Sequence, residues 1–331
     1  MTEKSKRALR LFAAMMALCL MLTGCGNGTE EGNGTQPTEG KEILPQITEQ
    51  LEKTDEGIPV LRVWDTDEEK IGEMDLETYV QGVLAGEMKN DWPMEALKAQ
   101  AILARTFVLK FCSEKKSKYE NADISTDIEE AQAYDATGVN DRIEQAVAET
   151  RGLVLSSGGE LPYAWFHAHS GGMTALAKEG LNYEKDEPDY TQITQGHESE
   201  KAPKDAQEWQ ASFSMSEAVA AAKKAGAEGL DTINEVQVTK RGDSGRATEI
   251  TMNGLVVPAA ELRIALGSSK MRSTLLTSIK IENGKLVMAG KGYGHGVGMP
   301  QWGAYALAEE GKGAEEIVQT YFRNVRVVRL W

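Results

Sequence analysis

The chain has 331 residues, of which 41% are hydrophobic and 26% are charged, as in globular proteins with a sizeable core. Its 51 acidic and 36 basic residues give a formal net charge of -15. Because so acidic a surface repels phosphate backbones, we expect no nucleic-acid partner. A neutral polymer or a small ligand is not excluded.

Residues 1–24 have the pattern of a secretory signal, in which basic residues precede an apolar run at residues 11–22. The run is too short to cross a bilayer comfortably. It ends in LTGC, residues 22–25, which resembles a bacterial lipobox, where the Cys is lipidated and becomes the mature N-terminus. We therefore predict an extracytoplasmic protein, anchored to the membrane by a lipid at Cys25. An ordinary cleaved signal peptide is the alternative.

Residues 25–57 are rich in Gly, Thr, Glu and Pro, so we expect a flexible tether. Loss of the signal leaves Cys25 and Cys112 as the only cysteines, which excludes a disulfide framework. We expect Cys112 to be a small buried residue of a helix.

The folded domain is predicted to extend from residue 58 to residue 331, beginning with a strand over residues 58–65. Asp75 is placed to cap the next helix, in which Leu76, Val80, Val83 and Glu87 share one face. A long core helix follows over residues 93–112, because its apolar residues recur at intervals of three and four.

The rest of the chain mixes hairpins with short helices. Hairpins are predicted over residues 153–172, 233–254 and 276–290. Helices are predicted over residues 142–152, 214–226, 259–267 and 314–322, with another ending at residue 311 and a last strand over 325–331. Residues 178–208 are largely polar and predict a surface excursion. Without strict βαβ alternation, the pattern indicates an α+β fold whose helices and hairpins form a cleft.

Glu87 is the first candidate for chemistry. A carboxylate at the end of an apolar face loses hydration, which raises its pKa toward the range that a general acid or base needs. A solvated helix glutamate is the alternative.

The histidines are weaker candidates. His167 and His169 are two residues apart, so on a strand they share a face and could begin a zinc site. No third ligand follows at a suitable spacing, which favours histidines that form hydrogen bonds in a polar wall. His197 is expected at the surface.

Glycines occupy every second position from Gly290 to Gly298, with Tyr293 and His295 between them. An extended chain would leave one side bare, able to lie against another backbone or a flat ligand. The missing βαβ context excludes a dinucleotide-binding loop. A strand packed on the core and the wall of a binding site both remain open.

Two long motifs, residues 76–107 and 290–322, together with the segment 241–274 between them, strongly resemble the SpoIID/LytB family of cell-wall proteins. The resemblance extends from about residue 58 to the C-terminus. It implies an extracytoplasmic lytic transglycosylase that cleaves the MurNAc–GlcNAc bond of peptidoglycan, prefers strands without stem peptides and leaves a 1,6-anhydro-MurNAc end. The catalytic glutamate of the family falls on Glu87.

The resemblance also implies substrate-binding positions in three motifs, KAQAILART, FHAHSGG and GYGHGVGMPQ. These positions are Lys98, Gln100, Arg105, His167, Ser170, Tyr293, His295 and Gln301. The chain departs from the family at Pro300, where many members carry Ser. It also lacks the Cys and His that bind zinc in some members, so we predict no metal and no cofactor.

A single glutamate suits this chemistry. Hydrolases of glycosidic bonds generally use two carboxylates, whereas a lytic transglycosylase uses the 6-hydroxyl of the sugar itself as nucleophile. The expected partners are peptidoglycan glycan strands, the membrane through Cys25, and other cell-wall hydrolases. One alternative is a non-catalytic enhancer of a cell-wall amidase, as LytB-type members are thought to be. Another is a metal-dependent hydrolase that uses His167 and His169.

Overall fold

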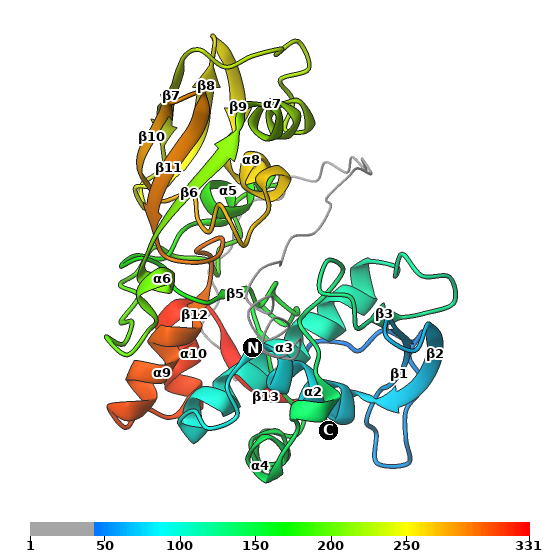
Figure 1. Ribbon diagram of the computed structural model, residues 1–331. Helices are drawn as coiled ribbons and strands as arrows, with labels where there is room; N and C mark the ends of the chain where they lie inside the picture. Colours follow the sequence, from blue (N-terminus) through cyan, green and yellow to red (C-terminus); the bar gives the residue numbers. More distant parts are fainter. Residues whose placement is uncertain (1–42) are drawn as a thin grey trace, which may run out of the picture.

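The structure is a computed structural model that describes residues 43–331 (Figure 1). Helices and several small sheets confirm the predicted α+β class. Among the described residues, no helix combines the length and apolarity needed to span a bilayer. The predicted signal, Cys25 and the tether up to residue 42 lie outside the described residues.

The helical lobe occupies the lower part of Figure 1. Its helices are α2 (Leu76–Glu87), α3 (Met94–Glu114), α4 (Asp141–Glu149), α9 (Gln301–Glu309), α10 (Ala314–Tyr321) and the 3-10 helix η1 (Ala136–Gly138). Its strands are β1 (Val60–Asp65), β2 (Lys70–Asp75), β3 (Ile124–Ser125), β4 (Leu153–Ser156) and β13 (Arg326–Arg329). Helix α3 is buried on two sides, against α2 and α4 on one and against α9 and α10 on the other. The first and last parts of the chain therefore share one core.

The sheet lobe lies above it in Figure 1. One sheet has the order β10-β11-β6 and the other β7-β8-β9, and both share a core with α7 and α8. The strands are β6 (Glu208–Ser214), β7 (Val236–Arg241), β8 (Ala247–Met252), β9 (Leu255–Pro258), β10 (Leu276–Glu282) and β11 (Lys285–Lys291). The helices are α5 (Ala177–Leu181), α6 (Lys204–Gln207), α7 (Met215–Lys224) and α8 (Ala259–Leu266). The predicted hairpins β7–β8 and β10–β11 are confirmed, the latter turning at Asn283 and Gly284 with positive φ.

The predicted hairpin over residues 153–172 is wrong. The turn after β4 is present, but β4 pairs with β13 at the other end of the chain. The residues after the turn enter β5 (Phe166–His167), which pairs in parallel with β12 (Met299–Pro300). Long-range pairing therefore overrides the local turn signal, and it brings the glycine-rich stretch beside residues 165–171.

Two expected surface segments are packed. Within the predicted tether, Leu51 is buried in the core of the helical lobe and Ile47 packs against that core. In the polar excursion, Thr191 is fully buried and Glu198 accepts hydrogen bonds from Ser170. The polar composition of these two segments did not reveal that they pack on the protein, because a few buried side chains are enough to anchor a loop.

Candidate active site

Glu87 is the last residue of α2, at the end of the apolar face that the sequence predicted. Asp75 caps the helix by accepting a hydrogen bond from the Thr78 amide. Leu76, Val80 and Val83 are fully buried, whereas Glu87 is only half-buried. The carboxyl group is thus largely desolvated yet still reachable from solvent.

Two glycines on α2 bring a distant loop against Glu87. A Cβ on Gly86 would lie 2.7 Å from the Ala133 backbone, and one on Gly82 would lie 2.2 Å from the Tyr134 ring. This close approach lets the Ala133 N–H donate a hydrogen bond to Glu87 Oε1 at 2.8 Å. The spacing of Gly82 and Gly86, one turn apart on one helix face, was the sequence signal for this contact.

Gln301 approaches Glu87 from the other end of the chain. It is the first residue of α9, and its side-chain amide lies 3.3 Å from the Glu87 carbonyl oxygen and 3.5 Å from Oε2. Pro300 is the N-cap residue, with a φ of -75°, and it pairs with His167 between β12 and β5. Pro300 therefore lies where α9 begins, and its fixed φ suits that position.

Burial raises the pKa of Glu87 from its ordinary value of 4.5 to about 7, and the hydrogen bonds from Ala133 and Gln301 oppose the rise. None of the described charged groups forms an ion pair with it or contributes to the shift. A carboxyl group with this pKa can donate a proton near neutral pH and take it back.

Three aromatic side chains pack beside this site. Trp92, in the loop after Glu87, lies 4.5 Å from Trp302 and 5.1 Å from Tyr305 between ring centroids. Trp302 follows Gln301 directly, and Tyr305 is one helical turn further along α9. The cluster holds the loop against the start of α9. The sequence patterns did not predict this cluster, although its signal was three aromatic residues within the two motifs.

The glycine-rich stretch is not an open face. Gly292, Gly294, Gly296 and Gly298 all have positive φ, so the chain coils instead of extending as a strand. A Cβ on Gly294 would lie 2.5 Å from the His167 Cβ, and one on Gly298 would lie 2.0 Å from the Trp165 carbonyl. Packing on the core is confirmed, and the idea of a bare glycine wall for a ligand is wrong.

The two histidines of this region are buried. The ring centroids of His167 and His295 are 5.5 Å apart. His167 Nδ1 donates to the Val297 carbonyl oxygen, while His295 Nδ1 accepts from the Val297 N–H. Burial, with the charges of Arg263 and Arg246, lowers the pKa of His295 to about 3, so the ring is neutral at pH 7 and is a poor general acid.

Two of the expected substrate-binding residues make structural contacts, and their role in substrate binding stays a prediction. Arg105 is fully buried, with Nη2 2.6 Å from Glu77 Oε2 and Nη1 donating to the Leu153 carbonyl. Ser170 is also fully buried, and its amide and hydroxyl both donate to Glu198. Neither side chain has free surface with which to contact a glycan.

The remaining predicted positions do not contact Glu87 through hydrogen bonds in the described residues. The Lys98 ammonium lies 2.7 Å from Glu95 and 2.5 Å from Glu149, and so links α3 to α4. Tyr293 is buried, with the Arg272 guanidinium 4.9 Å from its ring centroid. Gln100 is fully buried, and its amide has no hydrogen-bond partner among the described residues. Substrate binding by these residues and by His167 and His295 stays a prediction.

No metal centre is found in the described part of the chain, residues 43–331. No three His, Cys, Asp or Glu side chains there converge as ligands would. His167 faces His295, whereas His169 accepts a hydrogen bond from the Gly171 amide and lies 3.6 Å from Glu198. The H-x-H pair therefore does not present both rings to one site.

Comparisons with known proteins show what the chain is similar to. Residues 65–156, which include Glu87, match the stage II sporulation protein (SpoIID) family model, and residues 160–298 match a domain of unknown function (DUF8618). Stage II sporulation protein D of Bacillus amyloliquefaciens is 30% identical over 84% of this chain and 80% of that protein.

Two further relatives differ in coverage. An uncharacterized protein of Brachyspira hyodysenteriae is 30% identical over 78% of this chain and 68% of its own length. The amidase enhancer of Bacillus subtilis is 26% identical over 73% of this chain but only 39% of its own length. The chain is a member of the SpoIID/LytB family.

Proposed function

We propose that the protein is a lytic transglycosylase that cleaves the MurNAc–GlcNAc bonds of peptidoglycan. The carrying observation is the half-buried Glu87 carboxyl, with a pKa of about 7 and hydrogen bonds from Ala133 and Gln301. Membership of a family that includes stage II sporulation protein D supports a role in the cell wall. Anchoring outside the cell through Cys25 belongs to the same proposal.

In the proposed reaction, protonated Glu87 donates its proton to the glycosidic oxygen as the bond to MurNAc C1 breaks. The resulting carboxylate then takes the proton of the MurNAc 6-hydroxyl, whose oxygen bonds to C1. The products are a free GlcNAc 4-hydroxyl and a 1,6-anhydro-MurNAc end, so no water is consumed and Glu87 ends protonated. No second carboxylate is required, in contrast to most glycoside hydrolases.

The groups around Glu87 have separate roles in this scheme. The Ala133 N–H and the Gln301 amide hold the carboxyl in position and stabilise its ionised form after the first proton transfer. Tyr305, half-buried and one turn beyond Gln301, offers an aromatic surface to a neighbouring sugar ring.

The test is incubation of the protein with glycan strands freed of stem peptides, followed by mass spectrometry of the products. Anhydro ends that disappear in Glu87→Gln, but persist in the exposed control Glu120→Gln, would support the proposal. Undiminished cleavage by Glu87→Gln would contradict the proposal. Loss of cleavage when a chelator is added to the wild-type protein would also contradict it and would favour metal-dependent hydrolysis.

The second candidate is a non-catalytic enhancer of a cell-wall amidase, which the similarity to the Bacillus subtilis amidase enhancer favours. Its signature would be no cleavage by the wild-type chain, combined with faster release of stem peptides when the chain is added to an amidase. That stimulation would persist in Glu87→Gln.

A further inference from the structure

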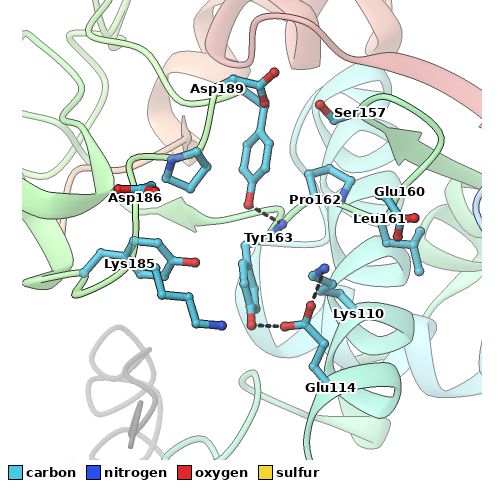
Figure 2. A pocket seen from close by; sticks show the side chains of 13 residues that line it. Lys110, Glu114, Ser157, Glu160, Leu161, Pro162, Tyr163, Lys185, Asp186 and Asp189 are labelled. Atoms are coloured by element: carbon cyan, nitrogen blue, oxygen red, sulfur yellow. Dashed lines mark hydrogen bonds and ion pairs between the residues drawn. The ribbon is translucent and has the colours of Figure 1, made fainter. Parts of the chain in front are cut away.

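A cavity of about 450 Å³ lies at the carboxyl end of α3, away from the candidate active site (Figure 2). Lys110 and Glu114 line it from α3, and Tyr163, Tyr183 and Tyr190 line it from the chain between β4 and β6. It thus lies between the segments that match two different family models.

The geometry of the helices places this cavity far from Glu87. Glu77, near the start of α2, contacts Arg105 in the middle of α3, and residues 88–93 join the end of α2 to the start of α3. Glu87 therefore lies level with the first turns of α3. Lys110 and Glu114 lie roughly 24 to 30 Å further along the helix, at about 1.5 Å per residue.

The aromatic walls of the cavity are held rigidly. Tyr163 stacks on the buried Trp165 with ring centroids 5.1 Å apart, and Tyr183 meets Trp165 edge-on at 5.7 Å. The Tyr190 hydroxyl accepts a hydrogen bond from the Tyr163 amide at 3.0 Å. Preorganised rings of this kind offer apolar faces, with phenol groups at their rims, to a ligand that has both apolar and polar surface.

The polar groups indicate what the ligand carries. Lys110 is neutralised by Glu114 at 2.6 Å, and the Tyr163 hydroxyl donates to the same carboxylate. Figure 2 shows the Lys185 side chain extending toward this pair. No carboxylate of residues 43–331 forms an ion pair with Lys185, although its charge lowers the pKa of Glu114. Glu160, Asp186 and Asp189 also line the cavity, so only direct contact with Lys185 favours an anionic group of a ligand there.

We propose that this cavity is a second glycan-binding site, remote from Glu87, in which the tyrosines pack against a sugar ring and Lys185 pairs with a carboxylate on that sugar. The proposal rests on the proposed glycan substrate. MurNAc without its stem peptide carries a free lactyl carboxylate, whereas GlcNAc has none. The site would hold a strand at a distance from the bond that is cleaved.

The experiment measures binding in the Glu87→Gln background, where cleavage cannot consume the ligand. Calorimetry with a GlcNAc–MurNAc tetrasaccharide lacking stem peptides should show two sites per chain. Tyr183→Ala should weaken binding at one of these sites by about tenfold or more. Lys185→Ala should weaken the same site by up to about fivefold for this ligand but not for a GlcNAc tetrasaccharide.

Matched controls separate this site from the active site. Lys285→Ala, which changes an exposed lysine elsewhere, should leave binding at both sites unchanged. Tyr183→Phe keeps the aromatic ring, so it should bind at the remote site like the wild type if the effect of Tyr183→Ala is the loss of ring stacking. With active protein, Lys185→Ala should raise KM for long strands more than KM for the tetrasaccharide, whereas Lys285→Ala should change neither.

A single binding site that is insensitive to Tyr183→Ala and Lys185→Ala would overturn the proposal, even if cleavage by Glu87 were established. Tighter binding of a basic peptide than of either saccharide at this site would overturn it as well. Conversely, two-site binding without any cleavage by the wild-type chain would contradict the proposed enzymatic function and leave the glycan site standing.

Discussion

The Gln301 side-chain amide lies 3.5 Å from Glu87 Oε2 and 3.3 Å from the Glu87 carbonyl oxygen, joining residues 214 positions apart in the chain. The contact brings the end of α2 together with the start of α9, and thereby the two motifs that carry the family resemblance. It also identifies Gln301 as a residue that positions the proposed acid.

The protonation state of Glu87 predicts the pH dependence of cleavage. With a pKa of about 7, the carboxyl is protonated below neutral pH and can act as the acid. We expect kcat/KM to decline above about pH 7 in a pH–rate profile. A profile that stays flat to pH 9 would contradict this assignment.

Gln301→Met removes the amide while keeping a similar side-chain volume. Because the amide stabilises the ionised carboxylate, its loss should raise the pKa of Glu87 further and shift the alkaline limb of the profile upward by less than about one unit. The exposed variant Gln319→Met serves as the control. A reduced kcat with an unshifted limb would indicate a structural role only.

The raised pKa of Glu87 also predicts how stability depends on pH. Between pH 4.5 and about 7 the folded state binds more protons than the unfolded state, so the free energy of unfolding falls as pH rises through this window. Glu87→Gln, which is neutral throughout, should therefore gain stability relative to wild type at pH 8 compared with pH 4, by at most about 3 kcal/mol.

Chemical denaturation of both proteins at the two pH values measures the difference. The exposed variant Glu120→Gln should show no such change. An equal effect of Glu87→Gln at both pH values would show that the carboxyl titrates normally.

Gly86→Ala tests the loop that contacts Glu87. The new methyl group would lie 2.7 Å from the Ala133 backbone, so residues 131–134 must move and the Ala133 N–H would leave Glu87. We expect a loss of about 1 to 3 kcal/mol of stability, together with reduced cleavage. Gly229→Ala, where nothing lies within 4 Å, is the control. Unchanged activity in a folded Gly86→Ala protein would remove Ala133 from the mechanism.

Arg105→Met should act on stability and not on substrate affinity. It leaves Glu77 buried without its partner, which costs about 3 to 5 kcal/mol for a buried ion pair. Thermal unfolding measures the loss, and KM of the remaining folded protein should be unchanged. A raised KM without destabilisation would restore Arg105 to the substrate-binding residues.

The sequence by itself determined most helices and the position of Glu87 on α2. Local periodicity decides which face of a helix is apolar, and Asp75, Asn283 and Gly284 act within a few residues of their own positions. Those features depend on neighbours in the chain, so they can be inferred from the pattern alone.

Only the tertiary structure decided what surrounds Glu87 and what the glycines do. The contacts of Ala133 and Gln301 with Glu87 are formed by segments distant in the chain, and no local periodicity encodes them. The same is true of the pairing of β5 with β12, which turns the glycine-rich stretch into a close-packed coil. The burial of Arg105 was likewise not predictable from the sequence. Its ion pair with Glu77 forms only where α3 packs against α2, and desolvation depends on which surfaces meet.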